Sequence, residues 1–591
     1  MFSKYNCRLA ALALRKVFSV SVVHSVVNVR DRKDMKRLGT SIALTLALSI
    51  GVNAAQSPIA DAAMHGDAAA VRALLKKGVD VNEAQGDGTT ALHWAAIKGN
   101  ADIAQMLIFA GANLRATTRL GGYTPLYLAA KGGHSAVVAS LLAAGADPKV
   151  TTTNGATPLM IASAAGDTKT ITALIENGSD LNAKDTAKGE TPLMFAAAFN
   201  RADAVKLLLA RGADHQATTK ILDLFALTAP EEEAMRRGVG GNSTRPQAAP
   251  ARVDIAGATR GYRYNELISS QGGMTALHFA ARQGFTDVVK ALVEGGADPN
   301  QPNAGDQTSP LLISIINGHF DLAMYLLDHG ANPTGAAFNG VTPLYAALNI
   351  QWAPKSLYPS PKAHQQQTTT YLQLMAALLD KGADPNARVS RKVWYQAYNS
   401  DYAGFDEAGA TPFFRAAYAS DVAAMKLLVS RGADPNIPTF KPAGRPFTGE
   451  GIRQIRDTSG VPPIPYGGPG VSPLHAATGV GYGEGFAANS HRYAPTGFLP
   501  AITYLVEEIG ADVNAVDHEG NTPVHLCAAR GDNECITFLV SKGADVTRVN
   551  REGNTTVDMA NGPVQRTQPY PETIKLLEGL GAKNNHRCVT C

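Results

Sequence analysis

The stretch Asn521–Asn550, NTPVHLCAARGDNECITFLVSKGADVTRVN, contains one complete structural unit. Thr522 can cap the free N–H groups of a helix start, and Pro523 suits the first helical position because it has no N–H to lose. A short apolar helix, a turn at Gly531–Asp532 and a second apolar helix follow. Gly543 stands just past that helix, where a left-handed residue is usually needed. One such unit cannot bury its own apolar face, so it requires copies on both sides.

The threonine or serine that opens the unit recurs along most of the chain. Its occurrences are Thr90, Thr124, Thr157, Thr191, Thr275, Ser309, Thr342, Thr411, Ser472, Thr522 and Thr555. Six of the ten intervals are 33 or 34 residues, and the four longer ones equal one unit plus an insertion. A fixed period of this length indicates a solenoid, which can reach 591 residues because a stack has no single core to outgrow.

These motifs resemble the ankyrin repeat family, which has a 33-residue period and a TPLHxA signature. The matching motifs are ALHWAA at Ala91–Ala96, ALHFAA at Ala276–Ala281, PLHAA at Pro473–Ala477, and GADPN at Gly296–Asn300, Gly382–Asn386 and Gly432–Asn436. The resemblance implies an all-α solenoid of about twelve helix–turn–helix repeats with hairpin fingers and five long insert loops. It also implies structural hydrogen bonds from the signature histidines, which are His93, His278, His475 and His525.

The N-terminus is typical of a bacterial, secreted or periplasmic member of this family. Residues 35–55 resemble a signal peptide, with the positive pair Lys36–Arg37, the short apolar run Ile42–Val52 and small residues up to Ala55. This leader predicts a periplasmic or secreted protein with no membrane span after its removal. Residues 1–34 are either an overextended N-terminus ahead of the true start or an arginine-rich targeting sequence.

The charge balance and the motifs argue against nucleic-acid binding and catalysis. Residues 1–37 hold nine basic and two acidic side chains, which leaves 45 basic and 48 acidic side chains in the rest of the chain. A nearly neutral body lacks the positive surface that a phosphate backbone requires. The sequence contains no HExxH, P-loop or GxSxG motif. We therefore predict a protein that is not an enzyme and carries no cofactor or metal.

The repeats divide into a first array at 56–219 and a second array at 271–583. A Gly-, Pro- and Arg-rich insert at 220–270 separates them at a finger position, and Ile221–Arg237 within it could form one extra helix. The inserts of the second array are 351–368, 388–405, 441–468 and 479–498. The middle two lie at finger positions, whereas the outer two lie between the helices of one repeat.

The inserts are rich in aromatic residues, with nine of the 18 tyrosines and two of the three tryptophans of the chain. Such side chains are enriched at interface hot spots. The inserts therefore either form a binding rim or fold back and bury their rings against the array. The residues predicted to contact a partner are Trp352, Trp394, Tyr395, Tyr398, Tyr402, Arg260, Tyr262, Arg263 and Tyr264.

The cysteines leave several interpretations open. Cys527 and Cys535 replace core residues of two paired helices, so they are either small apolar fillers or a disulfide. Cys588 and Cys591 in the tail at 584–591 have CxxC spacing. No histidine follows for haem attachment and too few ligands are near for zinc, so a small terminal disulfide or incidental residues fit better.

Together these patterns predict a non-catalytic scaffold that binds a protein partner outside the cytoplasm through its concave face and insert loops. Two other classes stay open. One is a small-molecule, redox or haem-associated function through the aromatic inserts or the CxxC tail. The other is a secreted effector that binds a host protein.

Overall fold

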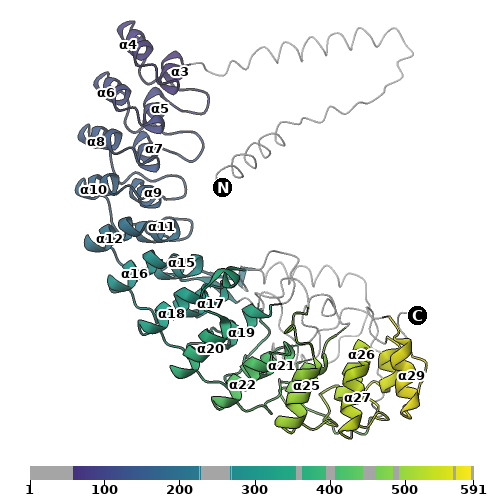
Figure 1. Ribbon diagram of the computed structural model, residues 1–591. Helices are drawn as coiled ribbons and strands as arrows, with labels where there is room; N and C mark the ends of the chain where they lie inside the picture. Colours follow the sequence, from purple (N-terminus) through teal and green to yellow (C-terminus); the bar gives the residue numbers. More distant parts are fainter. Residues whose placement is uncertain are drawn as a thin grey trace, which may run out of the picture.

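The described residues form one curved stack of helix pairs (Figure 1). The computed structural model describes residues 57–224, 226–227, 266–267, 269–353, 362–393, 406–443, 457, 459–482, 491–562 and 568–587. This part of the chain contains 24 α-helices, which pair into twelve repeats of one inner and one outer helix. The inner helices and the fingers line the inside of the curve, and the outer helices follow its outer side. The predicted fold class is thus confirmed.

The helix pairs follow one another in strict alternation. The inner helices are α3 (Pro58–Met64), α5 (Ala91–Lys98), α7 (Pro125–Lys131), α9 (Pro158–Ala165), α11 (Pro192–Ala198), α15 (Ala276–Gln283), α17 (Pro310–Ile316), α19 (Pro343–Gln351), α21 (Pro412–Tyr418), α23 (Pro473–Thr478), α26 (Pro523–Arg530) and α28 (Thr556–Ala560). The outer helices are α4 (Ala68–Lys76), α6 (Ala101–Phe109), α8 (Ser135–Ala143), α10 (Thr168–Glu176), α12 (Ala202–Ala210), α16 (Thr286–Glu294), α18 (Phe320–Asp328), α20 (Tyr371–Asp380), α22 (Val422–Ser430), α25 (Leu499–Thr503), α27 (Asn533–Ser541) and α29 (Pro571–Gly579). A 3-10 turn η1 (Ala363–Gln366) precedes α20, and a π-helical turn η3 (Tyr504–Glu508) continues α25.

The repeated residues explain where the inner helices begin and why they pack closely. At α9 the Thr157 side chain accepts the Met160 N–H, and Pro158 occupies the first helical turn. This cap satisfies a donor that would otherwise be free at the helix start. The alanine pair of each signature, such as Ala95 and Ala96, is fully buried. These small side chains allow neighbouring inner helices to approach each other closely.

A single backbone hydrogen bond joins each finger to the next. The Arg119 N–H donates to the Asp87 carbonyl at 2.8 Å, and the Thr153 N–H donates to the Gly121 carbonyl at 3.1 Å. The same bond recurs at eight later junctions, where the donors are Thr186, Lys220, Ala304, Phe338, Ser390, Phe440, His518 and Arg551. The fingers thus form a continuous backbone ribbon along the inside of the curve.

The finger inserts leave the solenoid through hydrogen-bonded stems. β1 (Ile221–Asp223) and β2 (Ser270–Gly272) pair antiparallel and lengthen the finger between α12 and α15. The prediction of a helix over Ile221–Arg237 is therefore wrong for its first three residues, which pair across the finger instead. At another insert the Lys441 N–H donates to the Gly468 carbonyl at 2.7 Å. Closed stems of this kind let long segments leave a finger without separating the repeats on either side.

Three signature histidines, His93, His278 and His475, connect a helix cap to the following finger, as the resemblance implied. At His525 the contact to the helix cap is formed, since Nδ1 accepts the Thr522 N–H at 3.2 Å, but Nε2 has no partner among the described residues. At His278, Nδ1 accepts the Thr275 backbone N–H at 3.2 Å. Because a backbone N–H can only donate, the ring proton lies on Nε2, which donates to the Thr308 carbonyl at 3.1 Å. His93 and His475 make the equivalent Nε2 contacts at 3.0 and 2.9 Å. The neutral histidine is therefore a tie between adjacent repeats.

The aspartates of the recurring GAD turns are also structural. Each accepts the backbone N–H of the residue two positions later at 2.8–2.9 Å; these aspartates are Asp147, Asp214, Asp298, Asp384 and Asp434. Such a turn fixes the chain as it leaves an outer helix and enters a finger.

Two glycines of one finger allow the contact between fingers to be tested. Gly145 and Gly155 have φ of +90° and +81°, so alanine is strained at both. An added Cβ meets nothing within 4 Å at Gly145, whereas at Gly155 it would lie 2.5 Å from the Thr186 backbone nitrogen. We expect Gly145→Ala to lower the free energy of unfolding by about 1 kcal/mol and Gly155→Ala to lower it by roughly twice as much. Urea unfolding measures both, and equal losses would contradict a close contact between the fingers.

The histidine ties predict a loss of stability in mild acid. Burial lowers the pKa of His278 and of His525 to about 4, while an unfolded histidine titrates near 6.5. Above pH 6.5 the ties are intact, and as the pH falls toward 4 the unfolded chain binds more protons than the folded one. The free energy of unfolding should then fall by on the order of 1 kcal/mol per pH unit for each histidine.

Urea unfolding at several values between pH 7 and pH 4.5 measures this dependence. The matched variant is His278→Gln, which can accept from the helix cap and donate to the next finger but does not titrate. We expect a shallower pH dependence in the variant. An unchanged slope would show that His278 does not carry the effect.

Candidate functional site

The burial of the fourth side chain of each inner helix shows whether the concave face is covered at that repeat. The inner helices line the inside of the curve, so an exposed side chain at this position belongs to the concave face (Figure 1). In the first array this position holds the half-buried Asp61 in α3 and then large apolar side chains that are only half-buried, namely Trp94, Leu128, Ile161 and Phe195. In the second array Phe279 is buried and Ile313 is half-buried, and from α19 through α26 the side chains are all buried, namely Ala346, Arg415, Ala476 and Leu526.

Residue size does not explain this difference. Leu128 and Leu526 are the same residue type at the same repeat position, yet Leu128 is half-buried and Leu526 is only 5% exposed. Arg415, a long cationic side chain, is only 4% exposed. Other parts of the chain therefore cover the concave face from α19 to α26.

The C-terminal end of α19 and the following Trp352 supply part of this cover by binding Arg415. Arg415 Nε donates to Asn349 Oδ1 at 2.6 Å, and its Nη2 donates to the Trp352 carbonyl at 2.7 Å. Burial lowers the pKa of Arg415, and the negative charges of Glu407 and Asp421 act in the opposite direction. A cation in the concave face is thus used as an internal tie and is not available to a ligand.

Trp352, one of the residues predicted to bind a partner, lies in the same cluster. Its indole N–H donates to Asp421 Oδ2 at 2.8 Å, and the Tyr371 hydroxyl donates to the same oxygen at 2.7 Å. Asp421 Oδ1 also caps α22 by accepting the Ala424 N–H. Burial and the Asp421 carboxylate raise the pKa of Tyr371, so its hydroxyl stays protonated as a donor. Trp352 therefore contributes to packing between repeats.

The segment before α25 covers the neighbouring stretch of the face. His491 stacks on Tyr418 with ring centroids 4.2 Å apart, and its Nε2 lies 2.7 Å from the Tyr418 carbonyl. Burial lowers the pKa of His491 to about 3, so the ring is neutral and can donate this bond. Arg530 lies 3.6 Å from the ring centre of Phe498 and pairs with Asp532 at 2.7 Å. Two inserts between helices thus contribute side chains to the buried face.

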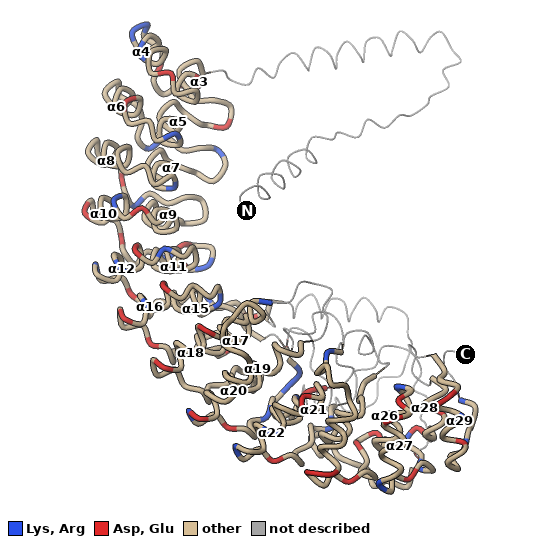
Figure 2. Tube along the Cα trace, viewed as in Figure 1, with Lys and Arg blue, Asp and Glu red and all other residues tan. Residues whose placement is uncertain are grey.

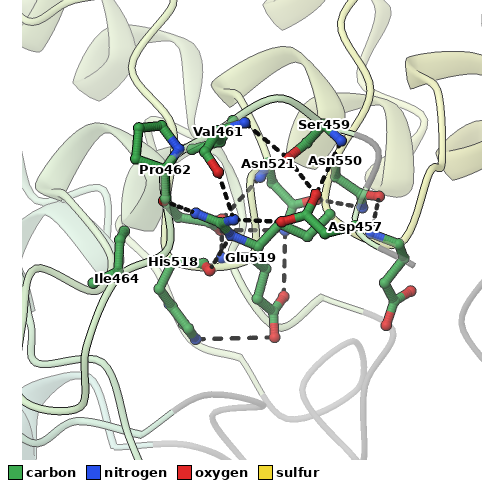
Figure 3. A network of polar contacts seen from close by, with 12 residues as sticks. Asp457, Ser459, Val461, Pro462, Ile464, His518, Glu519, Asn521 and Asn550 are labelled. Carbon is green, nitrogen blue, oxygen red and sulfur yellow. Dashed lines mark hydrogen bonds and ion pairs between the residues drawn. The ribbon is translucent and has the colours of Figure 1, made fainter. Parts of the chain in front are cut away.

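Arg551 holds a finger insert on the array, and Figure 3 shows the insert residues Asp457, Val461 and Pro462 beside His518 and Glu519. The Arg551 guanidinium donates to the His518 carbonyl at 3.0 Å, to the Val461 carbonyl at 2.9 Å and to Asp457 Oδ2 at 2.6 Å. These bonds hold the end of the insert at 441–468 against the fingers that precede α26 and α28. The described ends of this insert therefore pack on the array.

The other residues predicted to contact a partner lie outside the described residues. They are Trp394, Tyr395, Tyr398, Tyr402, Arg260, Tyr262, Arg263 and Tyr264. Cys588 and Cys591 of the tail also lie outside them. Their predicted roles stay predictions.

The first array contains a surface that the sequence did not single out. Tyr123 and Tyr127 stack with ring centroids 5.1 Å apart beside the half-buried Leu128. Leu120 on the adjoining finger is 83% exposed, and Phe199 at the end of α11 is 56% exposed. We call this set of side chains, together with Trp94, Ile161 and Phe195, the open face. The signal available in the sequence was the large apolar residue after the signature position in four consecutive repeats.

The described residues offer little for chemistry. Among them no group of three or more histidine, cysteine, aspartate or glutamate side chains is placed to hold a metal ion. Cys527 and Cys535 form a disulfide between α26 and α27, with Cα atoms 6.1 Å apart. The sequence left these cysteines as either apolar fillers or a disulfide, and the structure contains the disulfide. In the part of the chain that the structure describes, no helix is long and apolar enough to cross a bilayer.

Capped inner helices, histidine ties and a ribbon of fingers define a repeat solenoid with a concave surface for recognition. The family model "Ankyrin repeats (3 copies)" matches residues 39–118, 59–152, 126–219, 277–389 and 490–587, and the model "Ankyrin repeat" matches 408–440. The chain belongs to the ankyrin repeat family. Ankyrin repeats are in general modules for protein–protein interaction.

Relatives match only in part. Human BCL-6 corepressor-like protein 1 is 39% identical over 75 residues, which is 13% of this chain and 4% of that protein. The probable E3 ubiquitin-protein ligase XBOS33 of Oryza sativa subsp. japonica is 29% identical over 180 residues, which is 29% of this chain and 34% of that protein. The human ASB11 ankyrin repeat domain aligns over 47% of this chain and 100% of its own, with 25% identity and a TM-score of 0.35. The chain thus spans about a third or less of the curated relatives that it matches.

Proposed function

We propose that this protein is a non-catalytic scaffold that binds a protein partner on the open face of its first array. The observation that supports this most directly is the contrast at one repeat position, where large apolar side chains are half-exposed in the first array and covered from α19 to α26. Apolar and aromatic side chains on a rigid framework lose little conformational entropy on binding. The family's general role in protein interaction agrees with this surface.

We further propose that the protein acts outside the cytoplasm. The signal-peptide pattern at 35–55 supports export. The Cys527–Cys535 disulfide supports an oxidising compartment, because glutathione and thioredoxin keep most cytosolic thiols reduced.

The binding surface can be tested with exposed residues whose replacement should not disturb folding. The variant Leu120→Ser/Phe199→Ser removes two exposed apolar side chains of the open face, and the control Phe109→Ser removes a side chain on the outer helix α6 that is 95% exposed. Cross-linked pull-downs from envelope extract, read by mass spectrometry, should recover one partner with the wild type and the control. We expect recovery to fall by about tenfold or more with the double variant.

Two results would contradict this proposal. Equal recovery by all three baits would exclude the open face as the binding surface. Loss of the partner only when 388–405 and 441–468 are deleted would place the site on the inserts instead.

Export can be tested on the protein isolated from its own cells, denatured directly in a thiol-blocking reagent. Trypsin cleaves after Arg530, between the two cysteines, so a disulfide joins two peptides that separate on reduction. We expect this linked pair, together with an N-terminus near Ala55 in the soluble extracytoplasmic fraction. Blocked thiols at both cysteines in a cytoplasmic chain that still begins at residue 1 or 35 would refute export.

A further inference from the structure

We propose that the open face recognises a partner segment that is both apolar and acidic. This inference rests on the proposed function and adds the chemistry of the partner. It follows from the position of cationic side chains around the apolar surface, and from the way the nearby carboxylates are already used.

The cations gather in the third repeat, around the stacked tyrosines. Arg115 and Arg119 are exposed on the finger that carries Leu120, and Lys131 is exposed at the end of α7. Between Asp102 and Asp147 the chain contains no acidic residue. These three cations therefore flank an apolar surface with no carboxylate from their own repeat to neutralise them.

The next two fingers also carry exposed cationic side chains. Lys149, Lys184 and Lys188 are exposed on them, and Lys184 Nζ donates to the Thr218 carbonyl at 3.0 Å. Figure 2 shows the positions of Lys and Arg in blue and of Asp and Glu in red along the array. Lys188 lies 3.8 Å from Glu190, a distance at which an exposed pair is weak. The buried Asp185 uses one carboxylate oxygen to accept the N–H groups of Lys188 and Gly189 at 2.7 and 2.8 Å. Asp185 is thus engaged within its own finger and offers little to a ligand.

The carboxylates in the adjoining turns are also engaged. Asp147 accepts the Lys149 backbone N–H at 2.9 Å, and Asp87 accepts the Thr89 N–H at 2.9 Å. Hydrogen bonds to Thr89 lower the pKa of Asp87 against the effect of burial. The carboxylates of Asp61, Glu83 and Glu190 are half-buried. The six exposed cations named above outnumber the exposed carboxylates of Asp87, Asp147 and Asp180, so the open face has a positive rim.

The covered part of the second array provides an internal comparison. There the cation in the face, Arg415, is buried, hydrogen-bonded to Asn349 and Trp352, and opposed by the charges of Glu407 and Asp421. In α5, α7, α9 and α11 of the first array the corresponding positions are apolar, and the cations stand exposed around them. Arg115, Arg119 and Lys131 are exposed, so their charge is available to a partner.

A protein segment fits this surface better than a nucleic acid does. Tyr127 is buried and Tyr123 is half-buried, so their stacked rings offer edges and apolar flanks, not free faces on which bases could stack. A phosphate backbone would not bury the apolar side chains that lie between the cations. These side chains would bury leucine- or phenylalanine-like side chains, while the rim attracts carboxylates and speeds association.

The test is a selection from a display library of random peptides of about 16 residues, long enough when extended to cross several repeats. The immobilised full chain is the bait. We expect the enriched pool to be net negative and to contain several large apolar residues. An enriched pool that is neutral or net positive would overturn the proposal, and so would the absence of enrichment over a bait-free control.

Charge-reversed baits distinguish an effect of the rim on peptide binding from an effect of the protein's overall charge. The test variant is Arg115→Glu/Arg119→Glu/Lys131→Glu, and the matched control reverses the exposed outer-helix residues Arg72, Lys169 and Lys206 to Glu. A selected acidic peptide should bind the test variant about tenfold or more weakly and the control about as well as the wild type at low salt. Equal weakening by both variants would overturn recognition by the rim. So would displacement of the peptide by an equal concentration of a single-stranded oligonucleotide.

The variant Leu120→Ser/Phe199→Ser distinguishes this inference from the proposed function. Selected peptides that depend on Leu120 and Phe199 but show no preference for acid would overturn the partner chemistry and leave the binding surface in place. Selected peptides that depend on neither the apolar residues nor the rim would overturn both.

Discussion

One backbone hydrogen bond between successive fingers sets the arrangement of the whole chain. Each bond contributes only about 1 kcal/mol net, yet it recurs at all ten junctions between the described fingers. It requires a residue without a side chain where two fingers meet, such as Gly155, and it places every inner helix at the same offset from the last. The histidine ties strengthen the same junction from the helix side.

This regular framework carries two different surfaces. In the first array the fingers and the inner helices leave large apolar residues partly open. From α19 to α26 the same positions are covered, because the chain returns over them through Trp352, His491 and Arg551. The framework does not decide which surface forms, since its bonds are identical in both arrays. Whether a repeat has an open or a covered surface is decided by the added loops and by the residue at the fourth position of its inner helix.

The sequence predicted the framework well because every one of its contacts is repeated: the cap, the glycine and the histidine each recur at a fixed period. It could not predict which concave positions are covered, because each covering contact occurs once and joins residues far apart, as Arg415 and Trp352 do. Trp352 looked like a binding residue in an aromatic loop, but its indole bonds to Asp421, in the next repeat. The open face was missed because Leu128 and Leu526 cannot be told apart without knowing what lies over them.

The covering contacts also give the two arrays different mechanical properties. Repeats of the first array are linked to their neighbours mainly through adjacent helices and fingers, so small rotations can add up along the stack. In the second array Trp352–Asp421, His491–Tyr418 and Arg551–Asp457 bridge residues 69 to 94 positions apart. Such braces resist a change of curvature. The first array therefore bends more easily than the second, and a bound partner can change the curvature of the first array without changing that of the second.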